Sequence, residues 1–300
     1  IYDNFSRGVP GWINTLYNNE DIDIVRYDVI EPLPKNLGDF SYIIHAATIA
    51  SPTYYRLHPI ETMDANINGL RNLLEYCLKH NSYNKEVEGL LFFSTSEIYG
   101  DPHPDNIPTP ETYKGNVSCT GPRACYDESK RYGETLCVNF AQQYVVPVRI
   151  ARPFNNYGPG LKITDKRALP DFARNVLNGE DIVMFSNGTP TRTFCYVTDA
   201  INGFLRVIAR GVPGEAYNIG NPTPEISVFE LVDEIEKVLG KSIDKEVIEY
   251  PDSYPADEPN RRCPNIVKAR RQLDYNPVIT IEDGLKRFFD WTDETYNGEE

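Results

Sequence analysis

A tyrosine and a lysine four residues apart, Tyr126 and Lys130, form the spacing in this sequence that most directly suggests chemistry. The residues around them predict a helix over 126–144, and on a helix positions i and i+4 lie on one face. A phenol with its ordinary pKa of about 10 is a poor base at neutral pH, but a neighbouring ammonium favours the phenolate. Such a tyrosine can take a proton from a substrate hydroxyl. Considered alone, a solvent-facing pair of the same residues is the simpler interpretation.

A polar tip follows the buried strand that we predict at residues 90–95, and it consists of Thr95, Ser96 and Glu97. In a doubly wound sheet, ligands bind beyond the carboxyl ends of the strands, so this tip would face a binding cleft. Taken singly, the first two residues are a turn and Glu97 is a solvated carboxylate. The joint occurrence of strand, polar tip and a following Tyr-x-x-x-Lys helix favours a catalytic site.

The elements that must position these side chains alternate between strands and helices. Apolar runs predict strands at residues 22–27, 42–47, 90–95, 148–152 and 216–219. Helical spacing predicts helices at residues 59–80, 126–144, 169–177, 197–210, 228–239 and 281–292. This alternation predicts an α/β fold with a doubly wound parallel sheet. The last helices are expected to belong to a smaller C-terminal lobe.

The composition narrows the class of protein. Hydrophobic residues at 40% and charged residues at 25% are ordinary values for a globular protein. The 30 basic and 44 acidic residues give a net charge of −14, which argues against a nucleic-acid partner. No apolar run approaches the about 20 residues that cross a bilayer, so we expect no membrane partner. Six cysteines without C-x-x-C spacing predict reduced thiols in a cytoplasmic protein, and no metal site.

The chain resembles the extended short-chain dehydrogenase/reductases, the NAD-dependent epimerase/dehydratase family that acts on nucleotide sugars. The resemblance covers nearly all 300 residues. It is carried by residues 3–8, 45–47, 94–100, 152–159 and 192–197, together with Asn66, Tyr126 and Lys130. Within that family the chain is most similar to UDP-glucuronate decarboxylases, which make UDP-xylose. That similarity lies in residues 50–55, in residues 95–102 and above all in the run GPRACYDE at 121–128.

The resemblance implies an organisation for the whole chain. It implies a Rossmann-type sheet, with residues 1–155 and 194–222 forming the dinucleotide-binding domain. Residues 156–193 and 223–300 would form the smaller lobe that binds the nucleotide sugar. It also implies a homodimer paired through the helices at residues 59–80 and 126–144, with NAD as the cofactor and a UDP-sugar as the substrate.

The resemblance also implies roles for single residues. Tyr126 would be the base, Lys130 its electrostatic support and Thr95 a hydrogen-bond partner of the reacting hydroxyl. The catalytic group as a whole would be Thr95, Ser96, Glu97, Tyr126, Lys130 and Arg262. The NAD contacts would come from Asp3, Asn4, Asp28, Ala46, Tyr126 and Lys130. The substrate contacts would come from Tyr54, Asn155, Arg167, Arg192 and Arg262. Any one of these arginines is explained equally well by a surface salt bridge.

Decarboxylation fits the polar tip better than dehydration does. The dehydratases of the family carry Thr-Asp-Glu where this sequence has Thr95-Ser96-Glu97, and serine is a poor acid for expelling water. Decarboxylation needs no such acid, because a ketone at C4 of the glucuronosyl unit lies β to the C5 carboxylate and accepts the electrons left by CO₂. We therefore expect conversion of UDP-glucuronate to UDP-xylose through a transient 4-keto intermediate. Glu97 near the substrate carboxylate would favour CO₂ loss by repulsion, or would itself have a raised pKa.

The glycine-rich turn that holds the pyrophosphate in this family is not found in the sequence. We therefore expect the first βα unit of the sheet to be missing, by truncation rather than degeneration, because the other motifs are intact. Two further functions stay open at this point. One is a 4-epimerase or 4,6-dehydratase acting on a related nucleotide sugar, and the other is a catalytically inactive protein that binds sugar nucleotides.

Overall fold

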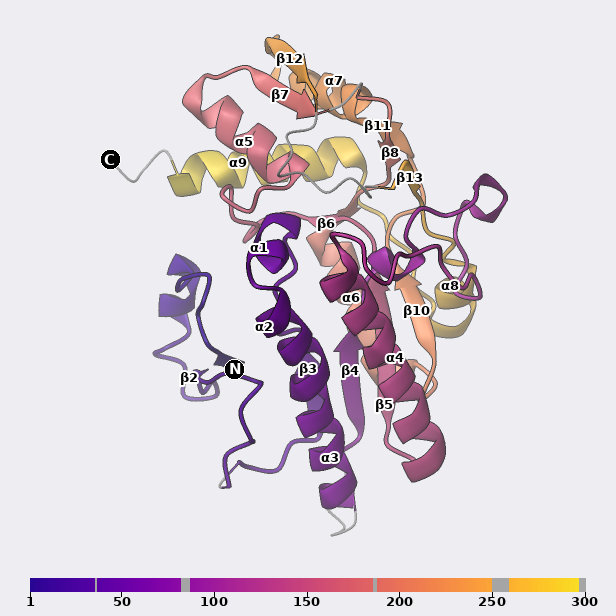
Figure 1. Ribbon diagram of the computed structural model, residues 1–300. Helices are drawn as coiled ribbons and strands as arrows, with labels where there is room; N and C mark the ends of the chain where they lie inside the picture. The colour runs from indigo at the N-terminus through magenta and orange to yellow at the C-terminus, as the bar shows by residue number, and fades with distance from the viewer. Residues whose placement is uncertain (36, 82–86, 186–187, 250–258, 297–300) are drawn as a thin grey trace.

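The centre of the molecule is a four-stranded sheet in the order β10-β5-β4-β3. The computed structural model describes residues 1–35, 37–81, 87–185, 188–249 and 259–296 (Figure 1). Every neighbouring pair in this sheet is parallel, which confirms the predicted doubly wound sheet. Its strands are β3 (Tyr42–His45), β4 (Gly89–Phe93), β5 (Val148–Pro153) and β10 (Ala216–Ile219). The helices that cover it are α3 (Leu70–Asn81), α4 (Ala124–Tyr144), α6 (Val197–Arg210) and α8 (Val267–Leu273).

Helices cover both faces of this sheet because successive side chains of a strand point to opposite faces. In β4, Leu90 and Phe92 are buried with the apolar residues of α3 and α4. Leu91, between them, is buried on the other face with residues of α6 and α8. A strand covered on both faces reads as a continuous apolar run, which explains why the sequence showed no alternation there.

A second, two-stranded sheet lies beside the first. Its strands β1 (Tyr2–Asp3) and β2 (Val25–Arg26) pair in parallel, with Tyr2 opposite Val25. The short 3-10 helix η1 (Gly11–Thr15) connects them. Asp3 is the last residue of β1 and Asp28 follows the end of β2. The two predicted cofactor residues therefore lie at the carboxyl ends of adjacent parallel strands.

The helix predicted at residues 59–80 is interrupted by a wider turn. It consists of α2 (Pro59–Asp64), the π-helical turn η2 (Ala65–Gly69) and α3, and it is preceded by α1 (Pro52–Leu57). The wide turn places Asn66 so that its side-chain amide donates a 2.9 Å hydrogen bond to the hydroxyl of Ser129 on α4. Single π-turns within helices often occur at functional sites.

A smaller lobe lies over the carboxyl ends of the sheet strands (Figure 1). Its core gathers buried apolar side chains such as Phe172, Leu231 and Phe288 from three helices. Those helices are α5 (Ala168–Asn178), α7 (Val228–Leu239) and α9 (Ile281–Tyr296). Its strand pairs are β7 (Ile182–Phe185) with β12 (Lys245–Ile248), and β6 (Asn156–Tyr157) with β9 (Cys195–Tyr196). A three-stranded sheet joins β11 (Ile226–Ser227), β8 (Thr191–Arg192) and β13 (Arg261–Arg262).

The predicted and observed elements agree closely in the second half of the chain. The bounds of α6, β10 and α7 coincide with the predicted ranges. The helix α8 and the two-residue strands of the smaller lobe were not predicted, because segments this short carry no periodic signal. Ile266, Leu273 and Tyr275 pack with the sheet core rather than with the lobe core. The predicted division into two domains stays a prediction. In the part of the chain described, no helix is long and apolar enough to cross a membrane.

Candidate active site

A cavity of about 390 Å³ opens between the carboxyl edge of the sheet and the smaller lobe. It is lined by residues from the end of β4, from α4, from the start of α5 and from β13. The polar tip after β4 and the Tyr-x-x-x-Lys pair therefore face the same space, as the sequence predicted. The predicted site residues in its lining are Ala46, Thr95, Ser96, Glu97, Tyr126, Lys130, Asn155, Arg167, Arg192 and Arg262.

Tyr126 and Lys130 lie one turn apart on α4 and both side chains are buried. The Tyr126 ring stacks on Tyr55 with 5.0 Å between the ring centres, and its hydroxyl is hydrogen-bonded with Thr95. The Lys130 Nζ donates a 2.7 Å hydrogen bond to the carbonyl of Phe93, at the end of β4. Each of the two residues is thus tied to the strand that carries the polar tip.

Burial is the main influence on the protonation of this pair. It raises the pKa of the Tyr126 hydroxyl to about 12, and the hydrogen bond with Thr95 opposes part of that rise. It lowers the pKa of the Lys130 ammonium to about 7. We expected the Lys130 ammonium to favour the phenolate. In the structure that influence comes from Thr95 and Arg167, whereas the Lys130 Nζ lies 5.8 Å from the centre of the Tyr126 ring.

Glu97 is held between two arginines. Its Oε2 atom accepts a hydrogen bond of 2.6 Å from Nη2 of Arg262 and another from Nη2 of Arg123. Arg123 in turn places its Nε 3.6 Å from Oδ2 of Asp127, in the first turn of α4. We expected Glu97 either to repel the substrate carboxylate or to have a raised pKa. The structure instead shows it neutralised by two guanidinium groups.

Arg123 is a site residue that the sequence analysis did not assign. Its side chain is only 5% exposed and it lines the cavity next to Tyr126. The signal was present in the run GPRACYDE, which carried the strongest family resemblance and contains Arg123, but a role did not follow from its position alone. Only the fold brings Arg123 to Glu97, 26 residues earlier in the chain.

Asp3, Asn4 and Asp28 lie outside this lining, where β1 and β2 end. The Asn4 side chain donates a 2.9 Å hydrogen bond to Oδ2 of Asp28, and Oδ1 of Asp3 accepts from the amide of Phe5. The arrangement fits a dinucleotide, because Asp3 at the end of β1 suits ribose hydroxyls, Asp28 after β2 suits the adenine, and the small Ala46 follows β3 in the cavity wall. The roles of these residues stay predictions.

The predicted substrate residues lie mostly on the lobe side. Nδ2 of Asn155 donates to the carbonyl of Thr193 at 2.9 Å, and Arg167 pairs with Asp165. Arg192 donates to backbone carbonyls, including that of Pro259 at 2.6 Å. These three side chains line the cavity.

Tyr54 does not belong to the lining formed by the described residues, whereas its neighbour Tyr55 does. The Tyr54 ring instead packs under the guanidinium of Arg7, 3.6 Å from the ring centre. Its substrate contact therefore stays a prediction that the cavity lining does not support.

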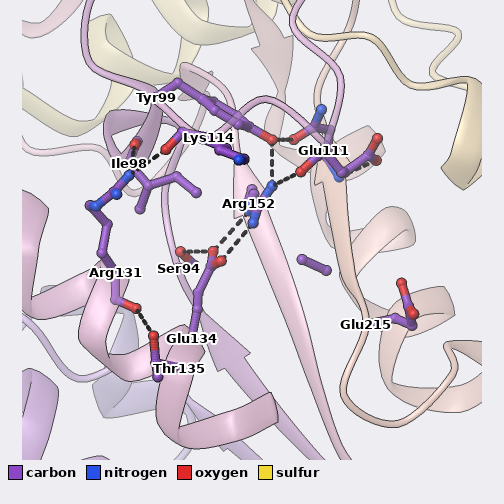
Figure 2. A network of polar contacts seen from close by, with 12 residues as sticks. Ser94, Ile98, Tyr99, Glu111, Lys114, Arg131, Glu134, Thr135, Arg152 and Glu215 are labelled. Carbon is purple, nitrogen blue, oxygen red and sulfur yellow. Dashed lines mark hydrogen bonds and ion pairs between the residues drawn. The ribbon is translucent and has the colours of Figure 1, made fainter. Parts of the chain in front are cut away.

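A network of polar contacts joins Ser94, the residue before the polar tip, to Glu134 on α4 (Figure 2). Glu134 accepts a 2.5 Å hydrogen bond from the hydroxyl of Ser94 and a two-armed ion pair from Arg152 on β5. Arg152 also donates to the hydroxyl of Tyr99, at the end of the 3-10 helix η3 (Ser96–Tyr99) that follows Thr95. Within the described residues, no group of three or more His, Cys, Asp or Glu side chains is placed to hold a metal ion.

Comparison with known proteins gives the family directly. The model of the NAD dependent epimerase/dehydratase family matches residues 3–220. The chain belongs to this family. UDP-glucuronic acid decarboxylase 5 of Arabidopsis thaliana is 36% identical over 287 residues, which cover 95% of this chain and 79% of that protein. UDP-glucuronic acid decarboxylase 1 of Xenopus tropicalis is 36% identical over 293 residues, covering 96% of this chain and 64% of that protein.

Solved members of the epimerase/dehydratase family have the same fold. UDP-glucuronic acid 4-epimerase from Bacillus cereus, solved with UDP-glucuronic acid and NAD, matches with a TM-score of 0.83 at 27% identity, over 98% of this chain and 90% of that one. A dTDP-glucose 4,6-dehydratase from Streptomyces venezuelae, solved with NAD bound, matches with a TM-score of 0.85 at 22% identity, over 99% and 88% of the two chains. The predicted family, its Rossmann-type fold and NAD as the cofactor are confirmed.

Proposed function

We propose that this protein is an NAD-dependent enzyme that converts UDP-glucuronate to UDP-xylose and CO₂. The observation that carries the proposal is one cavity lined both by the Thr95–Tyr126 pair and by the ion pair between Glu97 and Arg262. The first pair can move a proton at a sugar hydroxyl, and the arginine can receive a sugar carboxylate. The curated relatives cited above support the same substrate, since they are named UDP-glucuronic acid decarboxylases.

The first chemical step is oxidation at C4 of the sugar. NAD⁺ held near Asp3, Asp28 and Ala46 would supply the two-electron acceptor for the hydride of C4 and the hydride donor for the closing reduction. Tyr126 takes the proton of the C4 hydroxyl, and Thr95 holds that hydroxyl and the phenol in line. Burial, together with the nearby Glu97 and Asp127, keeps the Tyr126 proton in place, so the transfer depends on groups that favour the anion, and Thr95 and Arg167 act in that direction.

The second step is loss of CO₂ from C5. The bond between C5 and the carboxyl carbon breaks, and its electron pair moves into the C4 carbonyl to form an enolate. Arg262 binds the carboxylate beforehand, and Glu97 holds the Arg262 guanidinium in place. C5 then takes a proton from solvent water, and Tyr126 returns its proton to the C4 oxygen when the ketone is reduced. Ser96 faces this part of the cavity and orients the carboxylate.

The nucleotide end of the substrate is assigned to the lobe side of the cavity. Asn155, Arg167 and Arg192 line that side, and the two guanidinium groups complement a diphosphate. They also explain how a chain with a net charge of −14 holds an anionic ligand, because the positive charge is gathered locally.

The test is incubation of the protein and NAD⁺ with UDP-glucuronate, followed by measurement of CO₂ and of the nucleotide sugar formed. We expect CO₂ and UDP-xylose in equal amounts. Formation of UDP-galacturonate without CO₂ would show a 4-epimerase instead. Binding of UDP-glucuronate with neither product would show a catalytically inactive sugar-nucleotide-binding protein. Dehydration of UDP-glucose, run in parallel, tests the remaining alternative.

We further propose that the protein works in the cytoplasm as a homodimer. The dimer prediction is supported by exposed apolar side chains on neighbouring helices, namely Leu57 and Ile60 near the α1–α2 turn and Tyr132 on α4. A second copy would cover this surface. Light scattering of the purified protein measures the mass, and the double variant Ile60→Asp with Tyr132→Asp is expected to be a monomer.

A further inference from the structure

A cluster of four charged side chains occupies one wall of the cavity: Glu97, Arg123, Asp127 and Arg262. All four have at most 16% of the side chain exposed. They come from η3, from the residue that precedes α4, from the first turn of α4 and from β13. Glu97 bridges the two arginines through a single oxygen atom, Oε2. We refer to these residues as the arginine–carboxylate cluster.

The charge of this cluster is positive or neutral, never negative. The two guanidinium groups stay protonated at any physiological pH. The negative charge of Glu97 cancels one of these two positive charges. The carboxylate of Asp127 cancels the other, but only when it is ionised. Burial and the neighbouring Glu97 raise the pKa of the Asp127 carboxyl to about 7, so near neutral pH it is partly protonated. A buried cluster with excess positive charge is stabilised by an anion that enters the cavity.

Arg123 is the member that makes this balance possible. If only Arg262 were present, Glu97 would neutralise the positive charge that is to bind the substrate carboxylate. With Arg123 paired to the same Glu97 oxygen, one of the two positive charges remains in excess whenever Asp127 is protonated. Arg123 is held for this role by Asp127, one helical turn later, 3.6 Å from its Nε.

We propose that Arg123 is a specificity-determining residue that makes the cavity select a sugar carrying a carboxylate over a neutral sugar. This inference rests on the proposed function, since it assigns the carboxylate of the hexuronate to the arginine–carboxylate cluster. Arg123 acts through Glu97 and through the charge of the cluster, so it is a positioning residue.

The experiment compares ligands that differ only in the carboxylate. UDP-glucuronate and UDP-glucose are titrated calorimetrically into the NAD⁺-loaded protein, with Tyr126→Phe as the common background so that no substrate is consumed. Arg123→Gln removes the charge, Arg123→Lys keeps it, and Arg71→Gln removes an exposed arginine from another helix as the matched control. Thermal unfolding of each variant reports whether the fold is retained.

We expect Arg123→Gln to weaken UDP-glucuronate binding at least about tenfold, equivalent to about 1.4 kcal/mol, with UDP-glucose binding changed less than about threefold. Arg123→Lys should recover part of the preference, and Arg71→Gln should leave it unchanged. An equal loss for both ligands, or an unchanged ratio, would overturn the inference. The proposed function is tested separately, by CO₂ release from the protein with Tyr126 intact. A protein that selects the carboxylate through Arg123 but releases no CO₂ would contradict the proposed function and leave this inference standing.

Discussion

Glu134 accepts a 2.5 Å hydrogen bond from the hydroxyl of Ser94, the residue immediately before Thr95 (Figure 2). Tyr126, Lys130 and Glu134 follow one another at intervals of four on α4, so they lie along one face of the helix. Tyr126 is hydrogen-bonded with Thr95, and Lys130 donates to the carbonyl of Phe93. Glu134 accepts from Ser94. Three consecutive turns of the helix thus hold three consecutive residues at the end of β4. The distance between the base and the polar tip depends on this register.

Replacing Glu134 by Gln is expected to cost about 3–5 kcal/mol of unfolding free energy, because Arg152 would lose its partner while buried. Urea unfolding measures the loss. Glu128→Gln on the same helix is the matched control: its ion pair with Arg131 is more than a third exposed and is expected to contribute at most about 1 kcal/mol. A loss at Glu134 no larger than at Glu128 would contradict the role of the network. Ser94→Ala, which removes only the contact to the tip, should fold and show a lower kcat.

Replacing Tyr126 by Phe is expected to lower kcat by about 10²–10⁴-fold, because the proton of the C4 hydroxyl would have no acceptor. The stacking of the ring on Tyr55 does not involve the hydroxyl, so substrate affinity should change little. Absorbance of NADH in single-turnover mixing measures the oxidation step directly. As a control, Tyr144→Phe changes an exposed hydroxyl at the end of the same helix and should keep the kcat of the unaltered protein. Full activity in the Tyr126 variant would remove Tyr126 from the mechanism.

Affinity for UDP-glucuronate is expected to fall as the pH rises through about 7. In that range Asp127 loses the proton that burial and Glu97 favour, and the arginine–carboxylate cluster loses its excess positive charge. The charged groups that face Asp127 are Glu97, Arg123 and Arg262.

The matched variant is Asp127→Asn, whose side chain stays neutral at every pH. Its Kd is expected to depend less on pH between 6 and 8. Titration calorimetry at several pH values in the Tyr126→Phe background provides the comparison. Equal slopes in the two proteins would show that Asp127 does not set the charge of the cavity.

The stability of the fold is expected to fall as the pH drops below about 6.5, in part because of His45. This side chain is buried beside Lys130 and stacks on Phe92, and burial lowers the pKa of its imidazole to about 3. The unfolded chain therefore takes up a proton that the folded one does not, so the unfolding free energy decreases by at most about 1.4 kcal/mol per pH unit. His45→Asn should lose this part of the slope between pH 6.5 and 4. The exposed His103→Asn should keep it.

Much of the fold was predictable because its signals are local. The apolar periods of α6 and α7, and the short apolar run of β10, lie within a few residues of each other, and the observed bounds match them. The π-turn at Ala65–Gly69 was not predictable, because a single wider turn barely alters the period of the helix. The two-residue strands β8 and β13 also lacked a signal, since their form depends on the partner strand.

The order of residues is enough to show that a Tyr-x-x-x-Lys helix follows a strand with a polar tip, and that these motifs belong to one family. Helix spacing and strand ends are properties of neighbouring residues, so they can be read locally. Folding is needed to bring Arg123 and Arg262 to one oxygen of Glu97. Arg262 is 165 residues from Glu97 along the chain and reaches it through the pairing of β13 with β8. The balance of charge in the cavity arises from that meeting, because ion pairs depend on distance in space and on burial, neither of which is encoded in local spacing.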